Sequence, residues 1–119
     1  MCLDARFDRL ERRPLPGGLA ILVAGNRRSR MLGLARLDHL PADHAMLFER
    51  CRSIHTAGMR FALDLLWLDR HGRLVRLDRA VEPRRMRTCM RATAVIEANA
   101  GHGERFAAAL AHGRRGLEP

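Results

Sequence analysis

Three side chains near the middle of the chain could form a nucleophilic triad. Cys51 supplies a thiol, His55 an imidazole and Asp64 a carboxylate. In such a site the imidazole takes the proton of the nucleophile, and the carboxylate orients the imidazole. No Gly-x-Cys turn or oxyanion motif accompanies these residues, and a free cysteine is commonly a small buried hydrophobic residue. A small hydrolase-like enzyme is therefore an alternative interpretation of the chain and not the leading one.

Sulfur and imidazole groups could also bind a metal ion, with ligands drawn from Cys51, His55, His39, His44 and Cys89. Four-coordinate zinc sites normally contain close ligand pairs such as Cys-x-x-Cys, and the sequence has none. The histidines on either side of Pro41 each follow an aspartate, a pattern that turns and caps explain. We therefore expect neither a metal nor another cofactor.

Asp64 interrupts an apolar stretch that extends from residue 61 to residue 68. A carboxylate in that setting requires either solvent or buried hydrogen-bond partners. One interpretation is a positioned carboxylate that pairs with His55, or with an arginine, at the edge of a pocket. The other interpretation is structural, and it is favoured because buried polar groups are usually hydrogen-bonded for stability. Asp64 would then accept hydrogen bonds from backbone amides in the loop of residues 53–58.

A glycine-rich segment precedes the C-terminal helical pattern. Gly101, His102 and Gly103 could present backbone amides to an anion at the start of that helix. The fuller Gly-x-Gly-x-x-Gly pattern of phosphate-binding loops is missing. A turn is therefore the interpretation that we favour for this segment.

Short strands must position these groups. Apolar runs bounded by Gly, Pro and polar turn residues predict strands at 19–23, 45–48, 61–69, 74–77 and 94–96. The clearest hairpin joins the third and fourth of these runs through Arg70, His71 and Gly72, which supply turn chemistry. The pattern predicts one mainly β domain over residues 1–119, either a compact antiparallel β-sandwich or a barrel-like form.

One or two short helices complete the expected domain. The first would begin at Asn26, with Met31 and Leu34 on its apolar side, and would end before Pro41. The second is an Ala-rich helix at about residues 103–112.

The charge of the chain invites a nucleic-acid interpretation. The net charge is +9, and all 22 basic residues are arginines, which are spread along the whole sequence. The chain has no Tyr and one Trp, so that it lacks the aromatic residues on which single-stranded bases stack. Nucleic-acid binding is therefore a further alternative and not the leading one. Sparse cysteines and the lack of a long apolar run predict a cytoplasmic protein outside the membrane.

Several short motifs occur in an order that resembles the family catalogued as domain of unknown function 192. They span residues 19–101, and the densest of them is residues 53–64, Ser-Ile-His-Thr-Ala-Gly-Met-Arg-Phe-Ala-Leu-Asp. Further pieces are residues 30–34, 45–48, 66–69 with Gly72, Pro83, and 95–97 followed by residues 100 and 101. The resemblance implies a compact, mainly antiparallel β-sandwich, and it implies no established activity.

The leading interpretation of function is a non-catalytic module that binds a ligand or a protein partner. Loops on a rigid scaffold are where recognition residues concentrate, and the densest motif is a polar loop. The expected binding residues are Ser53, His55, Thr56, Gly58, Met59 and Asp64.

Overall fold

The computed structural model describes residues 7, 9–25, 34 and 40–117 of the chain. Its strands are β1 (Glu11–Leu15), β2 (Leu19–Val23), β3 (His44–Glu49), β4 (Ser53–His55), β5 (Leu63–Leu68), β6 (Leu74–Val81), β7 (Met86–Thr88) and β8 (Ala94–Asn99), and its helix is α2 (Gly103–Leu117). The helix predicted from Asn26 towards Pro41 falls mainly outside the described residues.

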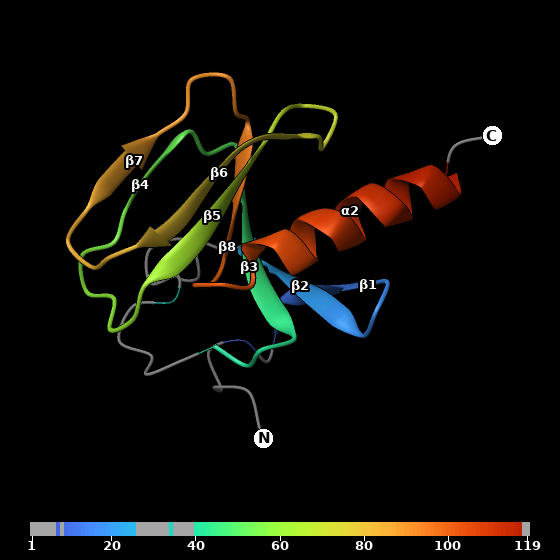
Figure 1. The fold of residues 1–119 in the computed structure, drawn as a ribbon, viewed down its shortest axis with the longest axis horizontal. Coiled ribbons are helices and arrows are strands. Elements are labelled where there is room, and N and C mark those ends of the chain that lie inside the picture. Colours follow the sequence, from blue (N-terminus) through green and yellow to red (C-terminus); the bar gives the residue numbers. More distant parts are fainter. Residues whose placement is uncertain (1–6, 8, 26–33, 35–39, 118–119) are drawn as a thin grey trace.

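Six strands form one mixed sheet in the order β1-β2-β3-β8-β5-β6, and β4 pairs with β7 in a second, small sheet (Figure 1). The mainly β fold with a helix is confirmed. All pairs are antiparallel as expected except β2 and β3, which run parallel. The barrel-like form is wrong, because β1 and β6 are the two edges of an open sheet.

The large sheet buries a different cluster of apolar side chains on each face, because successive strand residues point to opposite sides. On one face, Leu63, Leu65 and Trp67 of β5 pack in a cluster against which Cys51 and Ile54 also pack. On the other face, Leu66 and Leu68 pack with residues of α2, including Phe106 and Ala109. Figure 1 shows α2 and the β4–β7 pair on different sides of the molecule.

The hairpin between β5 and β6 turns where the sequence predicts it. Gly72 has a φ of 76°, a conformation that costs glycine little. The Asp69 carboxylate accepts backbone hydrogen bonds from His71 at 2.8 Å and from Arg73 at 3.0 Å. These local bonds fix the turn, which is why local sequence was sufficient to identify it.

The helix α2 begins at Gly103 and continues to Leu117, beyond the predicted end near residue 112. Its inner side places Phe106 and Ala109 against the sheet, and it contacts β1, β5 and β6. Among the described residues, no helix is long and apolar enough to cross a membrane.

Candidate functional site

Asp64 is a buried carboxylate with three backbone partners, and its side chain is 3% exposed. Its Oδ1 atom accepts a hydrogen bond from the Ala80 amide at 2.8 Å. Its Oδ2 atom accepts bonds from the amides of Gly101 at 3.0 Å and Gly103 at 2.8 Å. The prediction that amides of residues 53–58 are the partners of Asp64 was wrong. The segment of residues 101–103, which the sequence suggested could bind an anion, binds the Asp64 carboxylate.

The backbone of β5 and β6 departs from regular strand geometry beside Asp64. The register between β5 and β6 shifts between Leu63 and Leu65, and Ala80 on the partner strand has a φ of 51°. The Asp64 carboxylate contacts the first residue of α2, and this contact is favourable because the N-terminus of a helix carries partial positive charge. The hydrogen bonds therefore support the structural interpretation, in which Asp64 joins the start of α2 to two strands.

The structure does not bring the triad together. Cys51 packs with the cluster that contains Leu63 and Leu65, whereas Asp64 points to the opposite face of β5. The Cys51 thiol donates a hydrogen bond to the Ser53 carbonyl oxygen at 3.3 Å, and every hydrogen bond of Asp64 comes from a backbone amide. A relay from Asp64 through His55 to Cys51 has no support in this geometry.

Thr56 is the buried residue of the predicted binding loop, with an exposed fraction of 1%. Its hydroxyl donates to the Glu82 carbonyl oxygen at 2.7 Å and accepts from the Arg85 amide at 2.8 Å. Its own amide donates to the Arg85 carbonyl oxygen at 2.8 Å. Thr56 therefore joins the loop of residues 53–59 to the turn between β6 and β7.

The other predicted binding residues lie around Thr56 with different exposures. Ser53 and His55 are exposed on β4, and the Ser53 hydroxyl lies 2.9 Å from the Thr88 hydroxyl on β7. Gly58 adopts a φ of 82°, and the Met59 amide donates to the Thr56 carbonyl oxygen in the same turn. That these residues bind a ligand or partner stays a prediction.

The candidate metal ligands are dispersed among the residues that the structure describes, where no three His, Cys, Asp or Glu side chains form a cluster suited to a metal. His44 is buried on β3, with Nδ1 2.7 Å from Asp43 Oδ1. Cys89 is buried in the core. His39 lies outside the described residues.

A second buried carboxylate, Glu97, was missed as a candidate. It is 6% exposed, and it faces the same side of β8 as Val95, opposite Met46 and Leu65 on the neighbouring strands. Burial raises the pKa of its carboxyl group to about 7. The signal was available in the sequence, because Glu97, like Asp64, stands between apolar strand residues.

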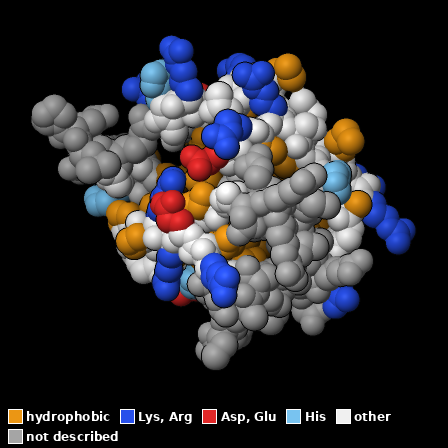
Figure 2. Space-filling view, turned by 180° about the vertical axis from the view of Figure 1, so that it is seen from behind, with side chains coloured by type: hydrophobic (Ala, Val, Ile, Leu, Met, Phe, Trp, Pro, Cys, Tyr) orange, Lys and Arg blue, Asp and Glu red, His pale blue; other side chains and the backbone are white. Residues whose placement is uncertain are grey.

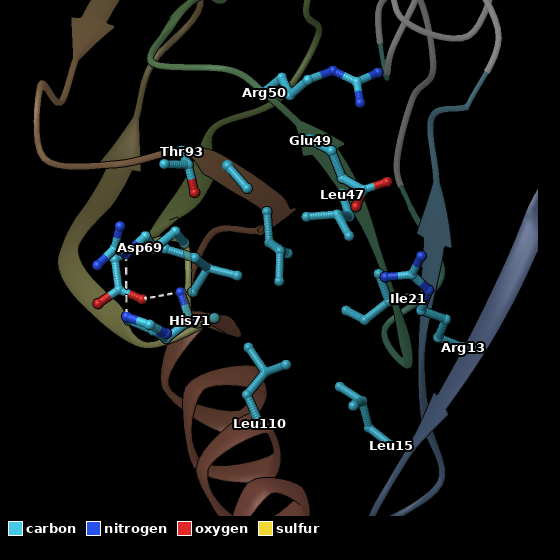
Figure 3. Close-up of a pocket in the computed structure, with 15 residues that line it drawn as sticks. Arg13, Leu15, Ile21, Leu47, Glu49, Arg50, Asp69, His71, Thr93 and Leu110 are labelled. Atoms are coloured by element: carbon cyan, nitrogen blue, oxygen red, sulfur yellow. Dashed lines mark hydrogen bonds between the residues drawn. The ribbon is translucent and has the colours of Figure 1, made fainter.

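A pocket of about 500 Å³ lies on the α2 side of the large sheet (Figure 3). Its walls come from β1, β2, β3, β8, the β5–β6 hairpin and the side chain of Leu110 on α2. The apolar lining consists of Leu15, Ile21, Leu47, Leu68, Ala94, Ile96 and Leu110. The polar lining consists of Arg13, Glu49, Arg50, Asp69, Arg70, His71 and Thr93.

Two charged side chains of the pocket, Asp69 and Arg13, are held by hydrogen bonds to nearby residues. Asp69 is held by the hairpin, and the hydrogen bond from the Arg73 amide is the main reason that its pKa is lowered. Arg13 bonds to Glu11 at 2.5 Å, which is the main cause of its raised pKa, and the charge of Glu49 adds to that effect. Figure 3 shows Glu49 and Thr93 on one side of the space, with Leu110 and Leu15 on the other.

The fold resembles two solved structures. A putative transcription regulator from Sinorhizobium meliloti 1021 is 23% identical, with a TM-score of 0.66 over 80% of this chain and 82% of the other. A protein of unknown function from Novosphingobium aromaticivorans is 16% identical, with a TM-score of 0.64 over 88% of this chain and 92% of the other. At these identities the likeness shows the fold alone.

No curated protein matches the chain. The family model DUF192, described as an uncharacterised ACR, matches residues 15–112. The chain therefore belongs to the DUF192 family.

Proposed function

We propose that this protein is a non-catalytic binding module and that its ligand occupies the pocket between α2, β1 and the β5–β6 hairpin. The observation that carries the proposal is the pocket itself, whose volume is about 500 Å³ and whose inner lining is aliphatic. Small-molecule sites are usually apolar cavities of about this size with a few polar groups that orient the ligand.

The lining of the pocket defines the ligand class. All seven apolar lining residues are aliphatic, so the inner lining of the pocket matches an aliphatic group better than a flat aromatic ring. Arginine and carboxylate side chains both stand at the polar side of the pocket. The fitting ligand is a small molecule with an aliphatic body and one polar or charged group.

Four aliphatic residues of the pocket lining already pack in the core. Ile21, Leu47, Leu68 and Ile96 are each less than 10% exposed and belong to the core cluster under α2. Side chains that already pack in a core need little further ordering when a ligand binds, which favours affinity. No cysteine or serine stands among the described residues that line the pocket.

A thermal-melt panel tests this proposal. Small aliphatic carboxylates, alcohols and amines should raise the melting temperature, whereas sugars and nucleotides should not. A ligand at roughly a hundredfold its Kd stabilises by about 2.7 kcal/mol, which corresponds to several degrees in a domain of this size.

Two tryptophan variants on α2 locate the effect. Leu110→Trp should fill the pocket and abolish the shift, because Leu110 lines it. Ala108→Trp is the matched control, since Ala108 is exposed on the same helix and does not line the pocket. If no aliphatic compound shifts the wild-type protein, or if Leu110→Trp responds like wild type, the pocket is not the binding site.

A further inference from the structure

Three large hydrophobic side chains are exposed in the described part of the chain, and two of them, Met86 and Met90, lie on β7 and just after it. Leu74 is 42% exposed, Met86 67% and Met90 71%. The Arg91 guanidinium donates to the Val75 carbonyl oxygen at 3.2 Å, and the Arg76 guanidinium donates to the Thr88 carbonyl oxygen at 2.9 Å. These bonds bring the start of β6 beside the segment that carries the two methionines. Leu74 pairs with Leu68, which packs on the α2 face of the sheet, so the Leu74 side chain points away from that segment.

Exposed hydrophobic residues are normal when they are scattered singly, but a group of them marks an interaction site. In Figure 2, hydrophobic side chains protrude along one rim of the molecule beside arginine side chains. Methionine is unbranched and flexible, so that it adapts to the shape of a bound segment. We call the β6–β7 surface the set Met86, Met90, Arg84, Arg85, Arg87 and Arg91.

The β6–β7 surface is strongly basic. Residues 74–91 contain six arginines and two carboxylates. One of these carboxylates, Asp78, already bonds to Arg76 at 2.9 Å and to the Trp67 indole at 3.0 Å. The Arg87 guanidinium donates to a backbone carbonyl oxygen, as the Arg91 guanidinium does, which holds it in place without neutralising its charge.

We propose that the β6–β7 surface docks an acidic segment of a partner protein that carries aliphatic side chains. The arginines attract the carboxylates of the segment, and the two methionines receive its aliphatic side chains. The proposal is independent of the pocket, which lies on another part of the molecule and has a separate lining.

A protein segment fits this surface better than a nucleic acid. Single-stranded nucleic acids bind to exposed aromatic rings, and the chain has no Tyr. Its one tryptophan, Trp67, and the helix residue Phe106 are both fully buried. The exposed apolar groups of this surface are the thioether side chains of Met86 and Met90, which match aliphatic residues and not bases.

Selection of short random peptides displayed on phage against the full-length protein tests the proposal. The selected peptides should be rich in Asp and Glu and should contain Leu, Ile or Met. Their affinity, measured by fluorescence anisotropy, should fall about tenfold in the double variant Met86→Ser, Met90→Ser, because buried anchor residues dominate binding energy. The same double variant should keep the wild-type melting temperature, since both side chains are mostly exposed.

Charge variants complete the test. Arg87→Gln with Arg91→Gln should weaken the selected peptides and reduce their salt dependence. The matched control is Arg9→Gln with Arg105→Gln, because these arginines are exposed elsewhere on the molecule. A selection without acidic and aliphatic enrichment would overturn the proposal. So would a single-stranded DNA that binds as tightly as the peptides and is unaffected by loss of the two methionines.

Discussion

The Oδ2 atom of Asp64 lies 2.8 Å from the backbone nitrogen of Gly103, the first residue of α2. The same carboxylate accepts bonds from Ala80 and Gly101, so one side chain joins β5, β6 and the helix start. Because α2 forms one wall of the pocket through Leu110, this contact also maintains the candidate site.

Asp64→Ala should lower the free energy of unfolding by about 2–4 kcal/mol, because three backbone amides lose a charged acceptor. Chemical denaturation measures this change. Glu104→Ala is the control, since Glu104 is an exposed acid in the first turn of the same helix and pairs with exposed Arg79. Its loss should cost less than about 1 kcal/mol. Equal losses in the two variants would show that Asp64 acts only as a helix-terminal charge.

Gly103→Ala should destabilise the protein although alanine favours helices. A Cβ atom at this position would lie 2.8 Å from Asp64 Oδ2 and 2.9 Å from Leu77 Cδ1. Gly113→Ala in the same helix should be neutral or stabilise by up to about 1 kcal/mol, because its nearest neighbour would be Pro16 at 3.7 Å. Melting temperatures of the pair decide the matter, and a Gly103→Ala variant as stable as wild type would contradict the close packing at the helix start.

Thr56→Val should cost about 1–3 kcal/mol, because the Glu82 carbonyl oxygen and the Arg85 amide both lose the hydroxyl. Thr56→Ser keeps the hydroxyl and should retain most of the stability. Hydrogen exchange should report faster exchange at residues 82–85 in the Val variant alone. Wild-type exchange rates in that variant would show that the loop and the turn are held together by other contacts.

Glu97 gives the protein a pH-dependent stability. Its folded-state pKa of about 7 lies above the ordinary value of 4.5, so the folded protein holds the proton at pH values where the unfolded chain has lost it. Its contribution to stability therefore decreases as pH rises from about 4.5 to about 7, by roughly 3 kcal/mol. Glu97→Gln removes this contribution, so wild type should lose stability relative to the variant over that range. Parallel unfolding curves at all pH values would contradict the buried, protonated carboxyl group.

The sequence predicts the parts of this fold that depend on neighbouring residues. Apolar runs and turn residues identify the β5–β6 hairpin because Asp69, His71 and Gly72 form it within a few positions. The mainly β architecture follows from several such strands. The parallel pairing of β2 and β3 was missed, since it depends on a connection longer than any local signal.

The partners of the buried polar groups could not be predicted. Asp64 binds Ala80, Gly101 and Gly103, which are far from it in sequence and meet it only through sheet pairing and helix docking. The sequence showed that the Asp64 carboxylate needs hydrogen-bond donors, but the predicted donors, the amides of residues 53–58, were the wrong ones. The pocket was missed for the same reason, because its lining comes from strands on both halves of the chain.

Methyl-detected NMR of the wild-type protein, titrated with a library of small aliphatic fragments, tests whether the pocket binds a ligand. We expect saturable shifts of the methyl groups of the lining residues Ile21, Leu47, Leu68, Ile96 and Leu110. The methyl groups of Leu63 and Leu65, on the opposite face of the same sheet, should remain unchanged. Shifts confined to other parts of the molecule, or no saturable shift with any fragment, would contradict the assignment of the pocket as the binding site.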